Sequence, residues 1–70
     1  MKLAFKDKIR SLDFDTDRTT VTFSTKPAFF WLCNEDSSLL ERLRAAYDGN
    51  LEVDIQWDPT TKQIVNVSLS

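Results

Sequence analysis

The spacing of apolar residues at the start of the chain predicts a long strand whose buried face changes partway along. Leu3, Phe5 and Ile9 fall on one parity of the sequence, whereas Leu12 falls on the other. Successive side chains of a strand point to opposite faces, so an extra residue must separate these two groups. We therefore expect one strand with a β-bulge near Arg10.

Two further strands follow, with turn signals between them. Residues 19–25 place Val21 and Phe23 on one face among polar neighbours, after a polar cluster that is typical of a hairpin turn. Pro27 ends this strand because proline has no amide hydrogen to donate to a ladder. The short aromatic stretch 28–33 is then predicted to be a third strand.

Helical spacing replaces alternation in the middle of the chain. Apolar residues recur three or four positions apart there, at Leu39, Leu40, Leu43 and Tyr47. Ser38 with Glu41 matches a capping box at the start of the helix, although Asn34 or Asp36 would start it earlier. Gly49, the only glycine, stands where a left-handed C-terminal cap is expected.

The last third of the chain predicts a second hairpin. Apolar and polar residues alternate strictly over residues 51–57, and alternation resumes over residues 65–69 after a turn at residues 58–61. The order of elements is therefore β-β-β-α-β-β, which is a mainly β fold with one helix.

This order, with its bulged first strand and a helix between the third and fourth strands, resembles the OB-fold over the whole chain, in architecture only. The resemblance implies a five-stranded barrel in which the first strand pairs with the fourth. Lys6, Lys8 and Arg10 would then face Glu52 and Asp54. Opposite charges on facing strands contribute about 0.2–1 kcal/mol per pair. An open α+β two-layer sheet with one helix satisfies the same pattern and is the alternative.

Length, charge and cysteine content narrow the functional classes. Seventy residues build one core, so residues 1–70 are expected to form a single domain. The net charge of −2 gives no general attraction to phosphate backbones or to membranes. A lone cysteine, Cys33, cannot form an internal disulfide, and Met1–Leu12 lacks the apolar run of a signal peptide. Both observations favour a cytoplasmic protein.

Residues suited to catalysis or metal binding are few. The chain has no histidine to act as a base for Cys33, which is better explained as a small buried residue sharing a face with Phe29 and Trp31. Aspartates at every second position of residues 13–17 have the spacing that opens a calcium loop. The glycine and the glutamate that complete such a loop are absent. We expect no enzyme activity, no bound metal and no cofactor.

A basic stripe favours one alternative function, a single-stranded nucleic-acid binding domain of the OB type. Lys2, Lys6, Lys8 and Arg10 share one parity, and the aromatic residues 29–31 lie nearby in the predicted barrel. Aspartates in the two loops beside such a surface would repel phosphates. Nucleic acid is therefore the less favoured partner.

The strongest functional signal is the run Phe29, Phe30, Trp31 and Leu32. On a strand these side chains must go to both faces. Either the helix covers the second face, or Phe30 and Leu32 form an exposed apolar patch of the kind that marks partner surfaces. An open edge near Thr20 and Thr22 would allow a partner to add a strand. We therefore hypothesise a small non-enzymatic module that binds another protein or a second copy of itself through these residues.

Leu43→Ala is expected to lower the free energy of unfolding by about 2–5 kcal/mol, because it removes a leucine from the core-facing stripe of the helix. Urea unfolding followed by circular dichroism measures the change. An unaltered unfolding midpoint would place Leu43 outside the core.

Overall fold

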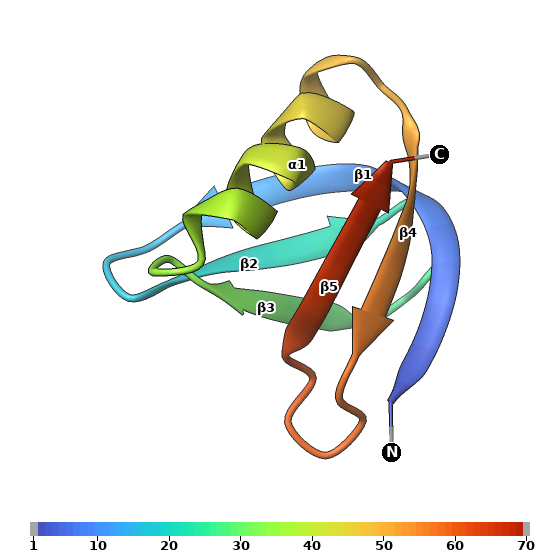
Figure 1. The fold of residues 1–70 in the computed structure, drawn as a ribbon. Helices are drawn as coiled ribbons and strands as arrows, with labels where there is room; N and C mark the ends of the chain where they lie inside the picture. Colours follow the sequence, from blue (N-terminus) through green and yellow to red (C-terminus); the bar gives the residue numbers. More distant parts are fainter. Residues whose placement is uncertain (1, 70) are drawn as a thin grey trace.

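A computed structural model describes residues 2–69 of the chain; Met1 and Ser70, the two ends of the predicted domain, lie outside the described residues. Six elements follow one another in the predicted order (Figure 1): β1 (Leu3–Phe14), β2 (Arg18–Phe23), β3 (Phe29–Cys33), α1 (Ser37–Asp48), β4 (Glu52–Trp57) and β5 (Ile64–Leu69). The β-β-β-α-β-β order and the mainly β class are confirmed.

The five strands form one antiparallel sheet in the order β3-β2-β1-β4-β5. The predicted pairing of the first strand with the fourth is confirmed, but the predicted closure into a barrel is wrong. A barrel needs a ladder between the two edge strands, whereas here a single parallel bridge joins Trp31 of β3 to Gln63, the residue before β5. The sheet is therefore open, and α1 packs against β1 and β5 (Figure 1).

β1 belongs to both halves of the curved sheet. Its first half pairs with β4 and its second half with β2, and the register shifts between Ile9 and Ser11. The predicted bulge at Arg10 is thus confirmed. Lys6 lies opposite Asp54, with their charged groups 4.0 Å apart, as the charge pattern predicts.

A cluster of four aromatic rings joins the two halves of the sheet. Phe5, Phe23, Phe30 and Trp57 come from β1, β2, β3 and β4, respectively. Phe30 packs edge-on against Phe23 and Trp57, with ring centroids 5.5 and 4.9 Å apart. Phe5 packs edge-on against Phe23 at 4.9 Å. The ammonium of Lys62 lies 5.2 Å from the Trp57 ring and covers one side of the cluster.

The exposed-patch hypothesis is wrong about β3, because the residues that it placed on the surface lie in the core. Phe30 is 2% exposed and Leu32 is fully buried, so the patch proposed for these two residues does not exist. The reason is the register with β2: Val21 lies opposite Phe30. Residues opposite each other in antiparallel strands share a face. Phe30 therefore follows Val21 into the core, and Phe29 points outward.

Both predicted helix caps need correction. The helix starts at Ser37 with Asp36 at its N-cap, one of the alternative starts, so Ser38 lies inside the helix and forms no capping box. Gly49 has a φ of −87°, and Asn50, with a φ of 53°, takes the left-handed conformation instead. A Cβ at position 49 would lie 3.2 Å from the Leu51 side chain, so glycine is favoured there by space.

The helix stripe is confirmed except at its last position. Leu39 and Leu43 are buried, whereas Tyr47 is 44% exposed and Ala46 is buried instead. A helical turn of 3.6 residues brings position 46 closer than position 47 to the direction of Leu39 and Leu43.

Phe30→Ala is expected to lower the free energy of unfolding by about 3–5 kcal/mol, because it removes a ring that touches three others. Chemical unfolding at equilibrium measures the loss. Phe14→Ala, which truncates an exposed phenylalanine, is the matched control. Equal losses in the two variants would mean that the ring cluster does not hold the sheet together.

Candidate functional site

Four of the six residues predicted to bind a partner lie together on the side of β2 and β3 that points away from the core. Thr20 lies opposite Trp31, and Thr22 lies opposite Phe29. We call these four residues the outer face. The other two, Phe30 and Leu32, belong to the core. The alternation that buries one half of the aromatic run thus leaves the other half on one surface.

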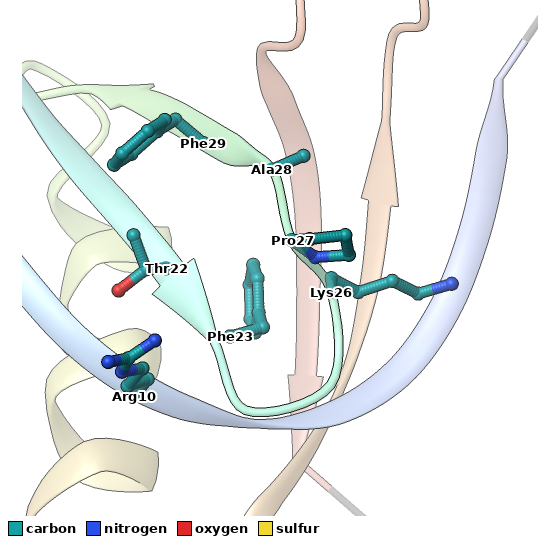
Figure 2. A pocket seen from close by; sticks show the side chains of 7 residues that line it. All are labelled: Arg10, Thr22, Phe23, Lys26, Pro27, Ala28 and Phe29. Atoms are coloured by element: carbon teal, nitrogen blue, oxygen red, sulfur yellow. The ribbon is translucent and has the colours of Figure 1, made fainter.

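A pocket lies beside Phe29, whose side chain is 71% exposed. The pocket has a volume of about 190 Å³ and is lined by Arg10, Thr22, Phe23, Lys26, Pro27, Ala28 and Phe29 (Figure 2). Small-molecule sites usually measure about 300–1,000 Å³. The pocket is therefore too small for a typical cofactor and matches the size of a side chain.

Trp31 is held in place on the outer face by the turn between β4 and β5. Its Nε1–H donates to the carbonyl oxygen of Thr61 at 2.8 Å, and its backbone N–H donates to that of Lys62 at 3.2 Å. The guanidinium of Arg18 lies 5.2 Å from the centre of its ring. The indole is consequently a fixed, half-buried platform beside the more exposed Phe29.

Thr20 and Thr22 do not lie at a sheet edge. β2 is paired with β1 on one side and with β3 on the other, so its backbone groups are used in two ladders. The hypothesis that a partner adds a strand next to these threonines is therefore wrong. Only their side chains remain available to a partner.

Asp7, which sequence reasoning missed, holds the loop that forms one wall of the pocket. Only 6% of Asp7 is exposed. Its carboxylate accepts hydrogen bonds from the backbone N–H of Thr25 at 2.9 Å, from the Thr25 hydroxyl at 2.7 Å and from the N–H of Lys8 at 2.7 Å. Burial alone would raise the pKa of Asp7, but these hydrogen bonds and the charge of Lys26 outweigh it, so the pKa is lowered.

The other candidates for chemistry are arranged as structural residues. Cys33 is half-buried at the end of β3, and its carbonyl oxygen accepts the N–H of Asp36. In the acidic turn, Asp15 accepts the N–H of Thr16. Within residues 2–69, the structure brings no group of three or more potential ligands together for a metal ion. No helix of this region is long and apolar enough to span a bilayer.

Comparison with known proteins identifies the fold but no family. No protein-family model and no curated protein sequence matches the chain. Two solved structures match, one of pro-protein-glutaminase and one of a mutant of it. Each is 21% identical to this chain with a TM-score of 0.82, and the match covers 93% of this chain. The matched part is 24% of the longer protein, so the chain corresponds to about a quarter of it.

Asp7→Asn is expected to lower the free energy of unfolding by about 1–3 kcal/mol at pH 7, because the hydrogen bonds to a charged acceptor are lost or weakened. A lowered pKa in the folded state means that the ionised form of Asp7 stabilises the fold above its unfolded pKa. This stabilisation is lost as the pH falls through the folded pKa.

The measurement is the difference in unfolding free energy between the two proteins as a function of pH, which should shrink in acid. Asp13→Asn, on the exposed part of the same strand, is the control. A difference that stays constant with pH would show that the Asp7 carboxylate does not stabilise the loop through its charge.

Proposed function

We propose that this domain is a non-enzymatic module that binds another protein through its outer face. The observation that carries the proposal is the position of Phe29, the most exposed large hydrophobic side chain of residues 2–69, at the rim of a pocket of side-chain size. An exposed aromatic residue beside a pocket is a common anchor of protein interfaces.

The rigidity of the surrounding residues supports this proposal. Trp31 is held by hydrogen bonds to the β4–β5 turn, and Thr20 and Thr22 lie on a strand that is paired on both sides. Binding through such a surface orders few side chains, which reduces the entropic cost of association.

The structural match is consistent with an accessory role. The matched protein has a name that marks it as the precursor form of an enzyme. The match covers only 24% of that protein's chain. A segment of a precursor that contacts the enzyme needs a binding surface and no catalytic residues of its own. The present chain has an exposed aromatic surface and no histidine.

Replacing Phe29 with the photoreactive analogue benzoylphenylalanine tests the proposal in extracts of cells that make the protein. Irradiation is expected to yield a discrete covalent adduct with another protein, because the exposed ring would contact the partner directly. Electrophoresis and mass spectrometry detect the adduct. An adduct at a multiple of 8.1 kDa would identify the partner as a second copy of the chain.

The same analogue at Phe14, which is also exposed but lies at the end of β1, is the control. Phe29→Ala in the unlabelled protein should compete poorly for formation of the adduct. An identical set of adducts from both positions, or none from position 29, would contradict the proposal.

A further inference from the structure

We infer that the outer face binds an extended segment of a protein with one acidic position, in which an apolar side chain fills the pocket beside Phe29 and a nearby carboxylate pairs with Arg10. This inference rests on the proposed protein-binding function and specifies the chemistry of the partner.

The positive charge for this pairing comes from Arg10, which lies at the β-bulge of β1. The register passes from the Ile9–Phe23 pair to the Ser11–Thr22 pair, which leaves Arg10 as the extra residue without a cross-strand neighbour. A bulge turns such a side chain away from the regular pleat. Arg10 is exposed and lines the pocket next to Thr22 (Figure 2). Among residues 2–69, its side chain makes no ion pair or hydrogen bond.

The pocket has no negative charge to satisfy this guanidinium. Its charged lining residues are Arg10 and Lys26, both basic, in a chain whose net charge is −2. The ammonium of Lys26 is directed away from the pocket and lies 5.1 Å from the Phe5 ring (Figure 2). Arg10 is therefore the cation available to a bound carboxylate, which its planar group can hold through two hydrogen bonds.

The remaining lining residues select an apolar neighbour for that carboxylate. Phe23, Pro27, Ala28 and Phe29 contribute mainly hydrocarbon surface, and the volume of about 190 Å³ accommodates a side chain. An acidic residue two positions from an apolar one in an extended peptide matches both features. In such a peptide, successive side chains point in opposite directions, so two side chains that are two positions apart face the site together. One of them can enter the pocket while the other reaches Arg10.

The charge pattern along the sheet favours an acidic peptide over a nucleic acid. Beyond the pocket, Asp13 of β1 lies opposite Thr20, which places a carboxylate next to the outer face. A phosphate chain following the strands would be repelled there. Lys6 and Lys8, which would be needed to hold phosphates, lie opposite Asp54 and Glu52. A protein segment with one acidic position avoids this repulsion.

The test is selection of a phage-displayed library of random peptides on the immobilised intact domain, with Phe29→Ala as the counter-selection. Enriched peptides are expected to carry Asp or Glu two positions from an apolar residue. For a synthetic enriched peptide, fluorescence anisotropy should show that Arg10→Glu weakens binding at least about tenfold, or about 1.4 kcal/mol. Lys2→Glu changes the net charge equally at a position outside the pocket and should leave binding unchanged.

The outcomes separate this inference from the proposed function. Phe29-dependent peptides without acidic residues, bound equally by Arg10→Glu, would overturn the inference and leave protein binding intact. Failure to enrich any peptide that requires Phe29, together with no adduct from benzoylphenylalanine at position 29, would overturn both. Binding of oligothymidylate that is lost in Arg10→Glu would replace the acidic peptide with nucleic acid. Thermal melting of each variant confirms that it is folded.

Discussion

Packing among four aromatic rings is the constraint on which the shape of this domain depends. The sheet is open: β1 joins its two halves, but no ladder closes its two edges, where a single bridge links Trp31 and Gln63. The rings of Phe5, Phe23, Phe30 and Trp57 close the gap from four different strands. Edge-on aromatic pairs contribute about 0.5–1.5 kcal/mol each beyond the area that they bury. Ring packing therefore adds to the bulge of β1 in holding the curved shape of the sheet.

The outer face follows from the same packing. Once Phe30 enters the ring cluster, alternation along β3 directs Phe29 and Trp31 to the opposite surface, next to the threonines of β2. In a strand with aromatic residues at consecutive positions, alternate side chains thus pack in the core and the others lie on the surface. The fixed indole of Trp31 and the exposed ring of Phe29 are the result.

Elements with regular periodicity could be predicted from the sequence, and the side-chain directions of β3 could not. The strands, the helix, their order and the bulge were predictable because each leaves a local pattern. The faces of β3 were not, because Phe29 to Leu32 are all apolar and alternation carries no information within such a run. The register with β2 decides this, and Val21, already expected to face inward, indicates it once paired with Phe30. Asp7 shares the inward parity of Phe5 and Ile9, but its partner could not be predicted. Thr25 is distant in the sequence and donates through both its backbone N–H and its hydroxyl.

The two hydrogen bonds from Thr25 to Asp7 affect how ordered the wall of the pocket is. Thr25 directly precedes Lys26, Pro27 and Ala28, which line one wall, and proline further restricts the backbone there. Without these hydrogen bonds, the loop would sample many conformations and would have to become ordered on binding, which lowers the association rate. Here the hydrogen bonds from Thr25 to Asp7 form on folding, so the start of this wall is held in place before any side chain enters the pocket.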